Sequence, residues 1–184
     1  MKRAPKVRSS LLRRFLRARD GIAAVEFALI LPFMTLVYLG GYEIMEEIGA
    51  ERQVELSAAT VATIVTQYST ISASQTMPGI LAASTAVMTG LTTSDAAVTV
   101  TCITIDSTGK ATVAWSQALN GTARTVGATI TVPTALDVAN TTLILGETTY
   151  SYTPLIDFMK IGTRSLYSSI YMLPRNPGSI TLTT

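Results

Sequence analysis

The stretch that decides the fold is Ile22–Tyr42, IAAVEFALILPFMTLVYLGGY, in which Glu26 is the single charged side chain. At about 1.5 Å of rise per residue, a helix over this stretch is about 31 Å long, which matches the hydrocarbon core of a bilayer. The stretch therefore predicts a transmembrane helix over residues 22–43.

A secretory signal and a buried core helix are the alternatives to a membrane span. A cleaved secretory signal has a shorter apolar run that ends in a small-residue site, and Val37–Gly41 (VYLGG) is a poor version of one. A buried helix of a soluble core would also be apolar, but it does not account for the cations that directly precede this stretch. The sequence favours a membrane span over both.

The charge of the chain is strongly asymmetric. Residues 1–20 hold eight cations and one acid, a net charge of +7, whereas the rest of the chain holds six cations and eleven acids, a net charge of −5. Basic residues beside a membrane span stay on the cytoplasmic side, which predicts a cytoplasmic N-terminus and a C-terminal region on the opposite side of the membrane. The cations are Lys2, Arg3, Lys6, Arg8, Arg13, Arg14, Arg17 and Arg19.

Nucleic-acid binding is the competing use of such a basic arm, because phosphate contacts need only clustered Lys and Arg. Phe15 is the one aromatic residue among these cations, and an apolar stretch follows directly. We expect no nucleic-acid partner.

The composition argues against an enzyme. The chain of 184 residues is 48% hydrophobic and 14% charged, with no His and one Cys. These counts remove the commonest general base, His-based metal sites, Cys/His nucleophile pairs and an intramolecular disulfide. We expect one compact domain with an appendage, no catalytic residue, no cofactor and no metal.

A motif at the start of the apolar stretch carries a family resemblance. Arg19–Leu29, RDGIAAVEFAL, followed by Pro32, resembles the N-terminus of the TadE-like family of minor pilins, or pseudopilins, of the bacterial tight-adherence (Tad/Flp) type IV-like pilus. Near the C-terminus, Tyr150–Leu155 (YSYTPL) and Met172–Arg175 (MLPR) are similar to the family's Y-x-Y-x-P strand and closing segment. Together these parts cover about a third of the chain and leave the middle unmatched.

The resemblance implies processing by a prepilin peptidase, which would cut between Gly21 and Ile22 and remove the leader, residues 1–21. Glycine suits a narrow protease cleft, since a residue without Cβ adopts conformations that others avoid. A purely structural role is also open, in which Asp20 and Gly21 only break the chain before the helix, with Asp20 as its N-cap. The two roles are compatible.

The resemblance also assigns assembly and recognition roles to Glu26 and Phe27. A carboxylate within a membrane span costs about 3 kcal/mol and is a functional candidate by default. After cleavage, Glu26 would be the fifth residue and would meet the new Ile22 α-amino group of a neighbouring subunit. The alternative is that Glu26 lies within about 8 Å of the cytoplasmic interface and reaches the headgroups. Pro32 predicts a kink or local melting of the helix.

Beyond the span, residues 44–184 predict an α+β domain. Ile44–Tyr68 continues the helix, with an apolar face of Val54, Ala58, Val61, Val65 and Tyr68. We interpret the acids from Glu43 to Glu55 as a solvated face. A break at Ser69–Gly79 precedes a short helix over Ile80–Met88.

The remaining segments alternate in hydrophobicity or are rich in β-branched residues, which is typical of strands. We expect about four antiparallel strands packed on the amphipathic half of the long helix, a pilin-like arrangement. A short helix could occupy Pro133–Asn140. The strand segments are Ala97–Ile105, Ala111–Gln117, Thr129–Val132, Thr141–Thr153 and Arg164–Leu173.

The aromatic residues and the cysteine are interpreted as packing residues. Alternation places Cys102 on the same strand face as Val98 and Val100, as a small buried residue. Sheet packing is favoured over a sugar or peptide platform for Trp115 and for Tyr150, Tyr152, Tyr167 and Tyr171.

The resemblance therefore implies a minor pilin or pseudopilin that is inserted in the bacterial inner membrane, processed and then assembled into a pilus. Its implied partners are the prepilin peptidase, other pilins, pilus-assembly proteins and membrane lipid. The alternative is an unprocessed single-pass membrane protein whose exported domain binds a partner. The N-terminal residue of the mature chain separates the two.

Overall fold

The computed structural model describes residues 20–158, 160, 162–176 and 178–184. The chain divides into two compact units, Met1–Ile44 and Met45–Thr184. One helix, α2, runs from Asp20 to Val65 and so contributes to both units. We call Met45–Thr184 the sheet domain.

The sheet domain is α+β, as the sequence predicts. Four strands form one antiparallel sheet in the order β3-β2-β4-β5, and β1 pairs with β6 in parallel. After α2, the elements are β1 (Thr70–Ser72), α3 (Met77–Ala86), η1 (Thr93–Asp95), β2 (Ala96–Ile105), β3 (Ala111–Leu119), η2 (Thr134–Leu136), β4 (Thr142–Tyr152), β5 (Arg164–Met172) and β6 (Thr181–Thr183).

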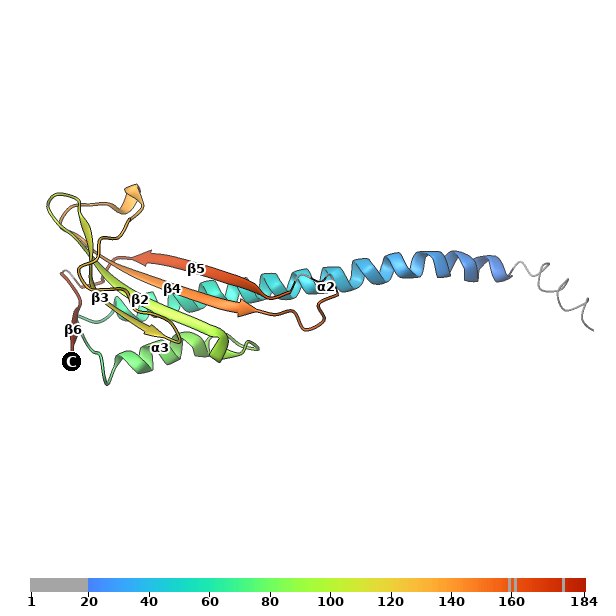
Figure 1. Ribbon diagram of the computed structural model, residues 1–184, viewed down its shortest axis with the longest axis horizontal. Coiled ribbons are helices and arrows are strands. Elements are labelled where there is room, and N and C mark those ends of the chain that lie inside the picture. The colour runs from blue at the N-terminus through green and yellow to red at the C-terminus, as the bar shows by residue number, and fades with distance from the viewer. Residues whose placement is uncertain (1–19, 159, 161, 177) are drawn as a thin grey trace, which may run out of the picture. The chain divides into compact units, whose positions relative to one another are not determined.

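The part of α2 that belongs to the sheet domain packs against β4 (Figure 1). Gly146 lies so close to α2 that a Cβ there would stand 2.5 Å from the Ala58 carbonyl oxygen. The Thr148 hydroxyl donates to Ser57 Oγ at 3.2 Å. The predicted apolar stripe faces the sheet and is buried at Val54, Ala58, Val61 and Val65.

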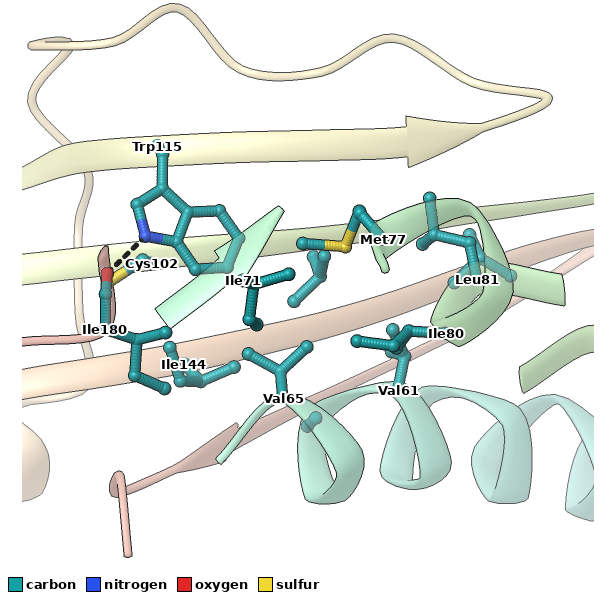
Figure 2. Packing of buried hydrophobic residues seen from close by; sticks show 13 residues of the cluster. Val61, Val65, Ile71, Met77, Ile80, Leu81, Cys102, Trp115, Ile144 and Ile180 are labelled. Carbon is teal, nitrogen blue, oxygen red and sulfur yellow. Dashed lines mark hydrogen bonds between the residues drawn. The ribbon is translucent and has the colours of Figure 1, made fainter. Parts of the chain in front are cut away.

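Helix α3 and the β1–β6 pair cover the rest of this sheet face. Figure 2 shows Val61 and Val65 of α2 with Ile80 and Leu81 of α3 in one apolar cluster. The buried Trp115 indole N–H donates to the Ile180 carbonyl oxygen at 2.6 Å, which ties the C-terminal segment to β3.

The opposite sheet face has its own apolar cluster. Ile103, Leu143 and Leu145 are buried there. The long connection between β3 and β4 packs over them with Ile130 and Leu136. This connection also bonds to the edge of β3, where the Val113 N–H donates to the Ala128 carbonyl at 2.9 Å.

Several predicted boundaries are wrong. Helix α2 ends at Val65 rather than Tyr68, because its last turn tightens into bonds from Gln67 to Ile64 and from Tyr68 to Val65. Tyr68 therefore leaves the buried face and is 39% exposed. Helix α3 begins at Met77, with a proline in its first turn. A proline is well tolerated there because the first-turn N–H groups have no intrahelical acceptor.

Two further segments differ from the prediction. Thr129–Val132 forms no strand, because only Thr129 makes a bridge, to Thr112 at the β3 edge. Pro133–Asn140 contains one short 3₁₀ turn, Thr134–Leu136, rather than a helix. The β6 strand had no sequence prediction, since three residues show no periodicity.

The acids from Glu43 to Glu55 do not form a uniformly solvated face. Glu43 is buried, and Glu47 forms an ion pair with Arg164 at 2.7 Å. Glu46, Glu51 and Glu55 are exposed, as predicted. The periodicity of α2 alone could not reveal that Arg164, at the start of β5, lies beside Glu47.

Candidate functional site

Most of the apolar stretch at the start of α2 is exposed in the structure. Every residue from Gly21 to Tyr38 is exposed, and none of the most apolar part of the helix is buried. The core helix of a soluble protein is mostly buried, so this exposure favours the membrane span over the soluble-core alternative. The helix is long and apolar enough to cross a membrane.

The four predicted site residues lie at the N-terminal end of α2. Gly21 and Ile22 are helical, and Glu26 follows Ile22 by one turn on the same face. Ile22 and Phe27 are 59% and 66% exposed. Within the residues that the structure describes, Glu26 has no hydrogen bond or ion pair, and its carboxylate projects from the apolar surface with no protein partner.

The predicted cleavage junction is part of the helix. Gly21 has no positive φ, and a Cβ added to it would meet nothing within 4 Å. Neither its conformation nor its packing therefore requires glycine in this structure. Glycine lowers helix stability by about 1 kcal/mol relative to alanine, which favours local unwinding of the junction.

The leader prediction falls largely outside the described residues. Residues 1–19, with the basic arm, are not among them. The side chain of Asp20, on which the N-cap prediction depends, also lies outside the described part of the chain.

Pro32 does not melt the helix. Helix α2 is continuous through this residue, contrary to the prediction of local melting. Proline cannot donate to the Ala28 carbonyl four residues earlier, so one backbone bond is lost. The Thr35 hydroxyl donates to the Leu31 carbonyl at 2.8 Å, an additional bond next to the proline.

A polar cluster around one buried acid in the sheet domain was not predicted from the sequence. Glu147 of β4 is 8% exposed, and its Oε1 atom accepts from Arg124 at 2.9 Å and from the Tyr167 hydroxyl at 2.8 Å. Desolvation is the main cause that raises the pKa of Tyr167, and the Glu147 charge adds to it. The cluster joins the β3–β4 connection to the sheet. The one available signal was an acid within the apolar run of residues 142–152.

Most packing predictions are confirmed. Trp115, Tyr150 and Tyr152 are buried. Tyr167 differs, because its ring is exposed on β5 and only its hydroxyl reaches Glu147. Cys102 is fully buried, and desolvation raises the pKa of its thiol to about 11.

Among the residues that the structure describes, no group of three His, Cys, Asp or Glu side chains is placed to hold a metal ion. Comparison of the chain with protein-family models, with curated proteins and with solved structures finds no match. The TadE-like resemblance therefore stays a prediction from the motifs.

Proposed function

We propose that this chain is a pilin-like assembly subunit, a TadE-like minor pilin or pseudopilin of a tight-adherence pilus. It is inserted in the inner membrane through the first half of α2, with the basic arm in the cytoplasm and the sheet domain in the periplasm. A prepilin peptidase cuts between Gly21 and Ile22, and the mature subunit then joins other pilins.

The observation that carries the proposal is the change of environment along α2. Its first half exposes apolar side chains on all sides, including Leu29 at 73% and Phe33 at 65%. Its second half buries one stripe against an antiparallel sheet. A helix that is first a lipid anchor and then the spine of a sheet domain supports a pilin-like subunit, while a soluble enzyme has no use for the exposed half.

Glu26 gives the proposal its assembly mechanism. Its carboxylate has no partner among the described residues, and a charge surrounded by lipid tails is costly. The α-amino group that cleavage creates at Ile22 supplies the opposite charge. When the Ile22 ammonium of a neighbour meets Glu26, two charges leave the polar interface together rather than singly, which favours one register between subunits.

Replacing Glu26 by Gln tests this mechanism. The Glu26→Gln variant keeps the side-chain shape and loses the charge. We expect cleavage after Gly21 and membrane insertion to persist, since a neutral amide costs less in lipid than a carboxylate. Incorporation into pili and co-purification with other pilins should fall at least tenfold.

The control is Glu55→Gln, the same change at an exposed acid of the sheet domain, which should assemble normally. Wild-type assembly of the Glu26→Gln variant would contradict the assembly role of Glu26. Recovery of an uncleaved chain from cells that have the peptidase would instead support the unprocessed single-pass protein.

A further inference from the structure

The connection between β4 and β5, Thr153–Thr163, exposes large apolar side chains to solvent. Leu155 is 90% exposed, Ile156 47% and Phe158 45%. Three neighbouring residues of this kind on one loop are a cost in water, because each leaves apolar area hydrated. We call Leu155, Ile156 and Phe158 the apolar loop residues.

The loop lies at the end of the sheet domain where its own part of α2 begins, near Met45. Along β4, Ile144 packs in the cluster that holds Val65, whereas Tyr152 packs in the cluster that holds Ala50. The strand therefore runs back toward the start of the domain, and the loop continues past its end (Figure 1).

The ion pair at the start of β5 fixes the same position. Arg164 contacts Glu47 at 2.7 Å, so the loop returns to the sheet beside Glu47. Glu47 is five residues beyond Tyr42, the end of the apolar stretch, which corresponds to about 8 Å of helix. The length of chain alone therefore keeps the end of the apolar stretch within about 18 Å of Glu47, whatever the direction of the preceding helix.

Hydrogen bonds join several of the described residues of the loop. The Thr153 and Thr163 hydroxyl groups are 3.0 Å apart and close its base. The Asp157 carboxylate accepts the Gly162 N–H at 3.1 Å, and the Lys160 N–H donates to the Asp157 carbonyl at 3.2 Å. The N–H groups of Lys160 and Gly162 are thereby bonded within the loop, while the apolar loop residues remain exposed.

We propose that the apolar loop residues insert into the outer interface of the same bilayer that α2 crosses, as a second membrane contact. The inference rests on the membrane anchoring proposed above. Insertion moves exposed apolar area into the headgroup and acyl boundary, where such side chains are stabilised. It also restricts how the sheet domain tilts on the membrane before assembly. Lipid is favoured over a protein partner because Arg164, directly after the loop, contacts Glu47, which is five residues of chain from the end of the apolar stretch.

A fluorescent label read by lipid quenching tests the proposal. The full chain in liposomes carries the label on one introduced cysteine at a time, and brominated acyl chains quench labels that contact lipid tails. The native Cys102 is fully buried, with a pKa of about 11, and does not compete for the label. The test variant is Leu155→Cys, and Ile156→Cys replaces it if the first variant does not fold.

Two control positions give the lowest and the highest quenching that we expect. Val138→Cys is a matched exposed apolar position, 55% exposed, in the connection before β4. The eleven residues of β4 place it about 34 Å from the loop along the strand. Leu31→Cys lies in the middle of the proposed span.

We expect brominated lipid to quench the Leu155 label at least twofold more than the Val138 label, and the Leu31 label most of all. Equal weak quenching at Leu155 and Val138 with strong quenching at Leu31 would overturn the loop insertion and leave the anchor intact. A blue-shifted but unquenched Leu155 label would also overturn it, because a protein partner would then cover the loop. An unquenched Leu31 label would contradict the proposed anchor and the inference with it.

Discussion

The two halves of α2 meet different environments although they form one helix. From Gly21 to Tyr38 every residue is exposed, and apolar side chains project in all directions. From Ala50 to Val65 the helix buries a stripe on the sheet and exposes acids such as Glu51 and Glu55. An all-round apolar surface fits lipid, whereas a stripe fits one protein face. The width of the apolar surface therefore distinguishes the two halves in the sequence: it extends around the whole helix in the first half and covers one face in the second.

The same substitution in the two halves therefore has different consequences. In the buried half, a lost or added methyl group disturbs protein packing and therefore lowers the free energy of unfolding of the sheet domain. In the exposed half, which we propose to lie in the membrane, the same change would meet lipid tails, which rearrange. Trp115 is the single tryptophan and is buried in the sheet domain, so its fluorescence reports unfolding of that domain alone.

The largest effect is expected for Gly146→Ala. The added Cβ would stand 2.5 Å from the Ala58 carbonyl oxygen, and backbone atoms of a packed helix cannot move aside cheaply. We expect a loss of about 3 kcal/mol in the free energy of unfolding, measured by denaturant titration in detergent.

Gly49→Ala is the matched control, because a Cβ there meets nothing within 4 Å. It should stabilise α2 by up to about 1 kcal/mol through helix propensity. Equal effects of the two changes would show that the contact of β4 with α2 is not close-packed.

A smaller effect is expected for Val61→Ala. Val61 is fully buried between α2 and the sheet, so the truncation leaves a cavity and should cost about 2 kcal/mol in the free energy of unfolding. The identical change at Val37, which is 53% exposed, should leave the unfolding of the sheet domain unchanged. A loss at Val37 as large as at Val61 would mean that the first half of α2 also packs on protein.

The smallest effect concerns pH. Burial raises the pKa of Cys102 from the ordinary 9.0 to about 11, so the folded state holds its proton more tightly than the unfolded state. The stability that the protonated Cys102 thiol gives to the folded state is fully present below pH 9 and is lost as the pH rises toward 11. At pH 10 we expect a loss of about 1 kcal/mol relative to pH 8. Cys102→Ala should remove this part of the pH dependence, and an unchanged profile would contradict the burial.

Periodic patterns allowed most of the fold to be predicted. The stripe from Val54 to Val65 and the alternation of Val98, Val100 and Cys102 each mark a buried face, and all of these side chains are buried. Prediction failed where structure depends on residues far apart in the chain. Three-residue strands such as β6 carry no period, and their pairing with β1 depends on a segment about 110 residues away.

The candidate site shows the same division. The exposure of Ile22 and Phe27 is compatible with the membrane span that the sequence predicts. The pairs of Glu147 with Arg124 and of Glu47 with Arg164 could not be predicted, because each joins charges from separate elements. No local pattern tells a solvated acid from one whose partner arrives from another strand.

The N-terminal residue and mass of the membrane-extracted chain test the central claim most directly. We expect cells with a prepilin peptidase to yield a chain that begins at Ile22 and lacks residues 1–21, and we expect a bulky residue in place of Gly21 to retain them. A wild-type chain that still carries residues 1–21 in such cells would contradict processing, and with it the proposed pairing of Glu26 with the Ile22 amine.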